Sequence, residues 1–157
     1  MKLIPFLIFL LTTSLSIKAN ELKLIGTGLA EFSIFKIDIY QVSYFKGSNG
    51  VEELHLDYKR DISKKYSILG WEKGLEPIKS RVPNFKEKYQ WIIDQVVDLK
   101  KGDIYKIRKE YNQVSMYKNS KLIGKITDPI IASIVFEPWI GKVPVDKDLK
   151  KKLLIKN

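Results

Sequence analysis

The chain has 157 residues, of which 45% are hydrophobic and 29% are charged, so it can build one globular domain with a core and is not a largely disordered chain. It contains no cysteine, which excludes disulfide bonds and attachment of lipid to a cysteine. The formal net charge is +10, but 25 of the 28 basic residues are lysines. Because phosphate and base recognition usually recruits arginine, we do not expect a nucleic-acid partner.

Residues 1–19 predict a secretory signal. Lys2 precedes an apolar run that is too short to span a bilayer comfortably, and small hydroxyl residues then lead to Ala19. We expect cleavage after Ala19, export to the periplasm and a mature domain of residues 20–157; an uncleaved anchor at the membrane surface is the alternative. Loss of Lys2 and Lys18, with no acidic residue removed, lowers the formal charge from +10 to +8. We attribute this charge to solvated lysines, and peripheral contact with an anionic membrane is the alternative.

The first part of the mature chain predicts β-strands. Leu22–Thr27 is a short apolar strand, and residues from Ala30 to Phe45 predict a long strand or a bent pair of strands. One face of this long stretch is apolar, whereas the other mixes charged, aromatic and apolar side chains: Lys36, Asp38, Tyr40 and Val42. A mixed face of this kind is typical of a strand that lines a ligand site, although a plain solvent face is equally common.

A further strand is predicted at Glu53–Tyr58, and it carries His55, the only histidine. A single histidine without cysteine does not form a histidine-rich metal site. We therefore expect no metal and no cofactor, and we place His55 at a surface or edge position.

Two helices are predicted next. Asp61 or Ser63 can cap the first, which approaches its end near Gly74. Asn84 is predicted to cap the second, with Glu87 at the third helical position as in a capping box. Its apolar positions are Phe85, Tyr89, Ile92, Ile93, Val96 and Val97, and Lys100, Lys101 and Gly102 close it. The width of this apolar stripe indicates that the helix lies on a sheet.

The segment after Gly102-Asp103 predicts a three-stranded antiparallel meander. Its strands are Ile104–Tyr111, Val114–Lys118 and Lys121–Ile126. Two-residue loops at Asn112-Gln113 and Asn119-Ser120 join them, because asparagine tolerates a positive φ.

The chain ends with two predicted helical segments. Asp128-Pro129 provides a cap followed by proline at the first helical position, and Pro138 stops this short helix. Asp146 begins a final helix that runs to Leu154. Strands followed by helices in two blocks predict an α+β domain with helices on one face of one sheet.

Several strings resemble the exported bacterial branch of the chalcone isomerase-like family. They are Gly26-Thr27-Gly28, Phe35-Lys36-Ile37, Gly102-Asp103, Tyr111, Asn119, Gly124-Lys125-Ile126, Asp128, Phe136, Trp139-Ile140-Gly141 and the helix Leu149–Leu154. The resemblance implies an open-faced β-sandwich, in which helices cover one face of an antiparallel sheet and leave a cleft between the layers. In the plant enzymes this cleft closes the third ring of a chalcone, whereas plastid relatives bind fatty acids with an arginine and a tyrosine at the carboxylate.

The enzymatic residues of that family do not carry over to this chain. The resemblance calls for an arginine just after the first glycine-rich strand, but the first arginine here is Arg60. Asp38 stands where the family places a threonine. Because a carboxylate would repel the oxyanion that develops in the reaction, we do not expect chalcone cyclisation.

Our leading hypothesis is a non-catalytic, monomeric protein that binds a fatty acid or a similar small apolar ligand with one polar end. The sheet and the helix beginning at Phe85 would form the apolar walls. Lys36, Asp38, Tyr40 and Arg60 are the candidates for the polar contacts, although Arg60 also fits a helix terminus or a surface ion pair.

Two alternatives stay open. The first is an intramolecular lyase or isomerase in which Asp38 is the general base and Tyr40 or Lys36 polarises a carbonyl, which requires Asp38 to lie in a dry cleft. The second is a structural envelope protein whose lysines contact anionic lipid headgroups.

Overall fold

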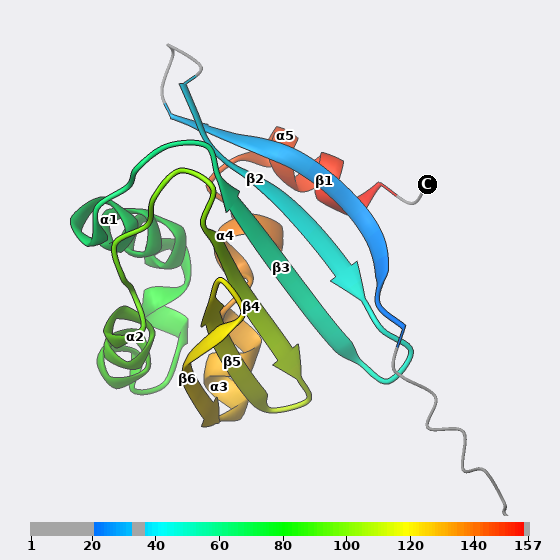
Figure 1. The fold of residues 1–157 in the computed structure, drawn as a ribbon. Coiled ribbons are helices and arrows are strands. Elements are labelled where there is room, and N and C mark those ends of the chain that lie inside the picture. The colour runs from blue at the N-terminus through cyan, green and yellow to red at the C-terminus, as the bar shows by residue number, and fades with distance from the viewer. Residues whose placement is uncertain (1–20, 33–36, 156–157) are drawn as a thin grey trace, which may run out of the picture.

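The computed structural model describes residues 21–32 and 37–155, and Figure 1 shows their arrangement. These residues contain one six-stranded sheet with the strands in chain order, and each neighbouring pair is antiparallel. The strands are β1 (Lys23–Phe32), β2 (Ile37–Lys46), β3 (Val51–Tyr58), β4 (Ile104–Glu110), β5 (Gln113–Lys118) and β6 (Lys121–Thr127). The helices are α1 (Lys64–Leu75), the 3₁₀ helix η1 (Glu76–Arg81), α2 (Phe85–Asp94), α3 (Pro129–Ile134), α4 (Glu137–Ile140) and α5 (Lys147–Leu154).

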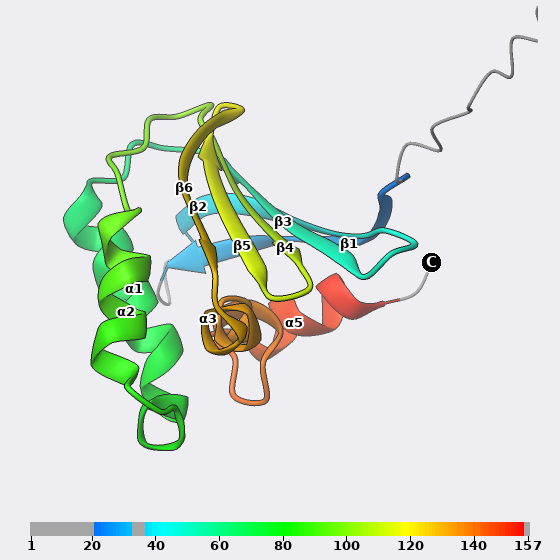
Figure 2. The ribbon, with the colours of Figure 1, turned by 90° about the horizontal axis from the view of Figure 1, so that it is seen from below.

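The helices lie on one side of a curved sheet, as Figure 2 shows. Alternation along the strands turns a set of buried apolar side chains toward these helices. This set includes Val42, Tyr44, Leu54, Leu56, Ile107, Val114 and Met116. The structure thus confirms the predicted α+β fold, an open-faced β-sandwich with a helical layer over one face of an antiparallel sheet.

The meander forms where it was predicted, with one loop displaced by a residue. The second loop is Asn119-Ser120, and both residues have a positive φ, 47° and 68°. The first loop is Tyr111-Asn112, in which Tyr111 has a φ of 53°. Gln113 belongs to β5 because it pairs with a residue on each side in the sheet, so its assignment to the loop was wrong.

The predicted end of α2 was also wrong. The helix ends at Asp94, so Val96 and Val97 are not helical. Leu99 instead pairs with Ile62 in an isolated antiparallel bridge, so the chain has left the helix before this residue.

Two predicted helix caps differ in the structure. Asn84 precedes α2 with a φ of 51°, and its side chain makes no cap hydrogen bond, so the capping box is absent. Ser63 precedes α1 without capping it through its side chain. The carboxylate of Asp98 accepts a hydrogen bond from the backbone N–H of Lys64 at 2.6 Å, so the cap comes from a segment distant in sequence. Asp128 and Asp146 cap α3 and α5 as predicted.

Close packing between α1 and α4 holds the helical layer together. A β-carbon added at Gly74 would lie 2.5 Å from Cβ of Pro138, so only glycine allows this approach. Beside this contact, the rings of Trp71 and Trp139 meet edge to face at 5.2 Å between centroids. Trp71, Gly74 and Pro138 are all buried.

We predict that Gly74→Ala lowers the free energy of unfolding by about 1–3 kcal/mol, because the new methyl group must displace the rigid ring of Pro138. Gly70→Ala is a matched control in the same helix, since nothing lies within 4 Å of its added carbon. That variant should gain roughly 0.5–1 kcal/mol from the helix propensity of alanine. Urea denaturation measures both effects, and equal stability of the two variants would contradict the packing described.

Asp103 links the start of β4 to the turn at Lys100 and to the end of β5 through hydrogen bonds and an ion pair. Its carboxylate accepts hydrogen bonds from the backbone N–H of Lys100 at 2.8 Å and from the side-chain amide of Asn119 at 2.7 Å. Lys118 lies 3.0 Å from the same carboxylate. The hydrogen bond from Lys100, then that from Asn119 and the nearby Lys118 ammonium, lower the pKa of Asp103 to about 2.

Because the pKa of Asp103 is lower in the folded than in the unfolded chain, its ionised form stabilises the fold at neutral pH. This contribution should disappear as the pH falls from about 4, the usual aspartate pKa, toward about 2. We therefore expect Asp103→Ala to destabilise the protein at pH 7 and to differ less from the wild type at acid pH. Denaturation over a pH series tests this, with the exposed Asp148→Ala as a control of small effect. A difference that does not change with pH would contradict the assignment.

Candidate functional site

Tyr40, one of the predicted site residues, belongs to a packed aromatic cluster. Its hydroxyl accepts a hydrogen bond from Nε1 of Trp139 at 3.1 Å. Its ring lies 5.1 Å from that of Tyr58, and Trp139 in turn contacts Trp71. Burial raises the pKa of Tyr40, and the hydrogen bond from Trp139 offsets part of the rise. Side chains therefore fill the space between sheet and helices at this point.

Asp38 and Arg60 lie together at the surface. Nε of Arg60 donates a hydrogen bond to the backbone carbonyl of Asp38 at 2.9 Å, and both side chains are exposed. The isomerase alternative required Asp38 to lie in a dry cleft, and its exposure removes that support. Lys36 lies outside the described residues.

The uncovered face of the sheet carries an ion-pair cluster that sequence reasoning missed. Glu53 is only 2% exposed, and its carboxylate contacts Nη1 of Arg108 at 2.7 Å and Nε2 of His55 at 2.6 Å. Burial alone would raise the pKa of Glu53, but the hydrogen bonds from His55 and Arg108 outweigh it and lower the pKa. His55 was predicted at a surface or edge. It does face the open side of the sheet, but β3 is an inner strand and the ring of Phe45 lies 4.6 Å away.

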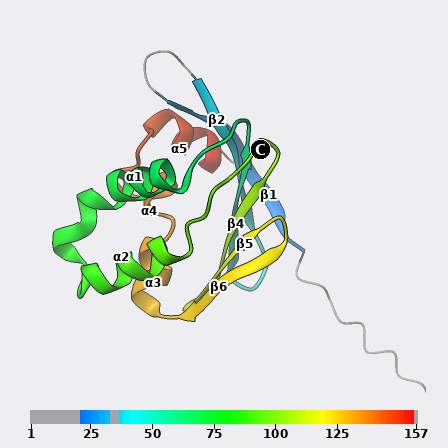
Figure 3. The same cartoon turned by 60° about the vertical axis from the view of Figure 1, so that its left-hand side comes forward.

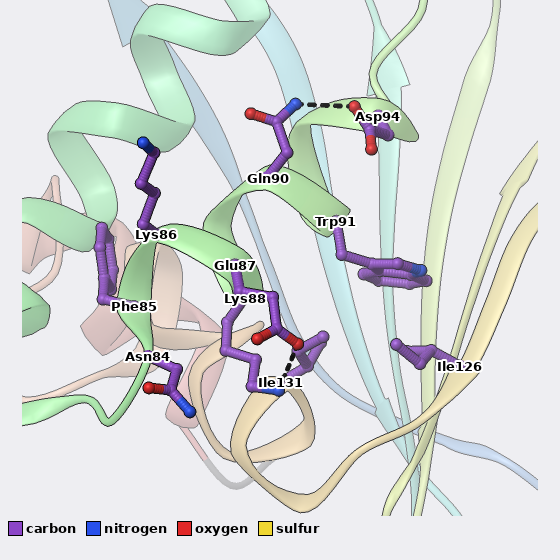
Figure 4. Close-up of a pocket in the computed structure, with 10 residues that line it drawn as sticks. All are labelled: Asn84, Phe85, Lys86, Glu87, Lys88, Gln90, Trp91, Asp94, Ile126 and Ile131. Carbon is purple, nitrogen blue, oxygen red and sulfur yellow. Dashed lines mark hydrogen bonds and ion pairs between the residues drawn. The ribbon is translucent and has the colours of Figure 1, made fainter.

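A groove of about 780 Å³ runs along α2, and Figure 4 shows its lining. Helix α2 provides one wall, and residues from β6 and α3 provide the other; Figure 3 shows α2 beside α3. The apolar side chains in the lining are Phe85, Trp91, Ile126 and Ile131, and the polar ones are Asn84, Lys86, Glu87, Lys88, Gln90 and Asp94. This groove uses the helix predicted to line a ligand site, but Asp38, Tyr40 and Arg60, the predicted polar residues that the structure describes, do not line it.

The sequence of α2 explains how the groove forms. Ile92 is fully buried against the core, whereas Trp91 is only partly buried and extends toward Ile126 (Figure 4). At the end of the helix, a β-carbon at Gly124 would overlap the side-chain amide of Gln95. Because β6 has glycine at this position, the end of α2 can lie close to the sheet.

An ion pair between α2 and the start of α3 forms the polar end of the groove. Nζ of Lys88 lies 2.8 Å from Oδ2 of Asp128 and 3.2 Å from Oε1 of Glu87. The other carboxylate oxygen of Asp128 accepts hydrogen bonds from the backbone N–H groups of Ile130 and Ile131 at 2.8 and 2.9 Å. Asp128 thus caps α3 and binds Lys88 at the same time.

Both members of this pair are charged at neutral pH. Hydrogen bonds to Asp128 and then to Glu87 raise the pKa of Lys88. Burial would raise the pKa of Asp128, but the contact with Lys88 and the backbone N–H of Ile131 outweigh it and lower the pKa. Sequence reasoning identified Asp128 as a cap only, because no local pattern indicates that Lys88 meets it.

Two general properties bear on the kind of site. Within residues 21–32 and 37–155, no group of three or more histidine, aspartate or glutamate residues is placed to hold a metal ion. In the same residues, no helix combines the length and apolarity needed to cross a membrane.

Comparison with known proteins agrees with the architecture. No curated protein sequence matches the chain. The crystal structure of a fatty-acid binding protein of Arabidopsis thaliana has a similar fold, with a TM-score of 0.68 and 11% sequence identity; the match covers 85% of this chain and 86% of that one. A likeness at this identity shows the fold alone. The model of the chalcone isomerase-like family matches residues 9–155, and the chain therefore belongs to the chalcone isomerase-like family.

Proposed function

We propose that this protein binds a fatty acid or a similar small apolar molecule with one polar end, without converting it chemically. The observation that carries this proposal is the groove along α2. Its volume of about 780 Å³ falls in the range of small-molecule sites, roughly 300–1,000 Å³. Apolar side chains from three elements lie beside polar side chains along α2, which is the combination that an amphipathic ligand needs.

In this arrangement the apolar chain of the ligand lies against Trp91, Ile126 and Ile131. Each square ångström of apolar surface removed from water contributes about 25 cal/mol, so this contact supplies most of the affinity. The polar end lies near Lys88 and Asn84, where side chains can fix its orientation.

The fold of the Arabidopsis fatty-acid binding protein supports a ligand-binding role for this architecture, although a fold alone does not determine function. Of the two alternatives, the isomerase has lost its support at Asp38, which is exposed. We also propose that the protein acts after export, on the basis of the signal predicted at residues 1–19.

We predict that Trp91→Ala weakens binding of a long-chain fatty acid or alcohol roughly tenfold, which corresponds to about 1.4 kcal/mol of lost contact. Tyr66→Ala is the control, because Tyr66 is an exposed aromatic residue on α1 outside the groove. Mass spectrometry of lipids that co-purify with each variant gives a second measurement, which requires no assumption about the ligand.

The same assay separates the groove from the site predicted at β2. Arg60→Ala and Lys36→Ala should retain ligand as the wild type does if the groove is the site. Loss of ligand in these two variants, with full retention in Trp91→Ala, would place the site at the end of β2 instead. Absence of any bound or added lipid in the wild type would contradict the binding function itself.

A further inference from the structure

We infer that the groove selects amphipathic ligands whose polar end is uncharged, such as a long-chain alcohol, over ligands that end in a carboxylate, and that Asp128 imposes this selection. The inference rests on the proposed binding function and specifies the chemistry of the ligand. It is carried by the distribution of charge around the groove.

The charged residues of the groove do not favour an anion. The lining contains two lysines, Lys86 and Lys88, and two acids, Glu87 and Asp94, and the Asp128 carboxylate lies directly behind Lys88. The formal sum over these five groups is −1. In Figure 4, Lys86 extends on the side of α2 opposite to Ile126, whereas Lys88 lies beside Ile131. Lys88 is therefore the lysine next to the apolar side chains of the groove.

Lys88 already has two anionic partners. Its side chain is 12% exposed and that of Asp128 is 16% exposed, so water screens this pair less than a surface pair. A ligand carboxylate that approaches Lys88 must either displace Asp128 or lie next to it. Displacement would break the ion pair that joins α2 to α3, and juxtaposition would place two anions side by side.

A hydroxyl group meets neither obstacle. It can donate a hydrogen bond to a carboxylate oxygen of Glu87 or Asp128 and accept one from Lys88, which has three N–H donors. The ion pair between Lys88 and Asp128 then stays intact. A long-chain alcohol therefore satisfies the polar end of the groove without a change in the charges that hold the two helices together.

Asp128→Asn tests the role of the charge without removing the cap. Asparagine caps helices as well as aspartate does, so its side-chain oxygen can still accept the hydrogen bonds from Ile130 and Ile131. The negative charge is lost, and Lys88 keeps only Glu87 as an anionic partner. The variant should therefore accept a carboxylate at Lys88.

The experiment measures displacement of a neutral fluorescent dye, Nile red, by palmitic acid and by hexadecanol at pH 8. In the wild type we expect hexadecanol to bind roughly tenfold more tightly than palmitate. In Asp128→Asn, the affinity for palmitate should rise roughly tenfold, so that the preference for hexadecanol over palmitate is lost. Adding Lys88→Met to this variant should remove the gain, because no ammonium would be left for the carboxylate.

Asp146→Asn is the matched control. Asp146 caps α5 with the same geometry, accepting hydrogen bonds from the backbone N–H groups of Asp148 and Leu149 at 2.8 and 2.9 Å, and it does not line the groove. This variant should bind both ligands as the wild type does. Circular dichroism melting curves establish that each variant is folded at the assay temperature.

The outcomes distinguish this inference from the binding function on which it rests. If palmitate binds the wild type as tightly as hexadecanol, or if Asp128→Asn leaves palmitate affinity unchanged, the inference is wrong and the binding function stands. If neither compound displaces the dye or binds directly by calorimetry, both the binding function and the inference are overturned.

Discussion

One-sided burial of the sheet is the constraint on which the rest of the structure depends. An antiparallel sheet that buries only one face needs a cover that approaches its backbone closely. Here glycines allow the close contacts of the helical layer. Gly26 of β1 lies against the end of α5, and Gly124 of β6 lies against Gln95 after α2. Within the helical layer, Gly74 of α1 lies against Pro138 of α4. These contacts position α1, α4, α5 and the end of α2, and they therefore also determine where a groove can form between the helices and the sheet.

The groove follows from how α2 is attached. Its end lies close to β6 through Gln95 and Gly124, and its first turns are joined to the start of α3 through Lys88 and Asp128. Between these two attachments, β6 is an edge strand, and no further strand lies beyond it in the described sheet. The apolar side chains of Trp91 and Ile126 are left partly exposed there, whereas the aromatic cluster around Tyr40 fills the interior under β2 and β3.

Elements with strong local signals could be predicted from the sequence. Asn119 marked a hairpin because asparagine tolerates a positive φ, and Asp128 and Asp146 marked helix starts because their side chains cap the residues that follow. The end of α2 could not be predicted, since it depends on the bridge between Leu99 and Ile62, which are distant in sequence.

The difference between local patterns and contacts distant in sequence also explains which parts of the candidate site could be predicted. Alternation along residues 36–42 predicted a face with mixed chemistry, but it could not show that Trp139 would cover Tyr40 or that Asp38 would be exposed. The wall formed by the helix beginning at Phe85 was predicted, because the apolar stripe of that helix is a local pattern. The sequence could not identify Lys88 as a site residue, because the chain has 25 lysines and only the contact with Asp128 on another helix distinguishes this one.

The fold of this chain does not by itself determine which polar groups lie between its layers. The resemblance to the family's enzymes implies an arginine just after the first glycine-rich strand, but this chain has no arginine before Arg60. Asp38 stands where the resemblance implies a threonine. The ion pair of Arg108 with the buried Glu53 lies on the open face of the sheet, away from the helices. The cation beside the groove is Lys88, whose charged ammonium is already paired with Asp128 and Glu87. In the selection that we propose, a cap residue of α3 sets the chemistry of the ligand, and a comparison of folds alone would not identify this residue.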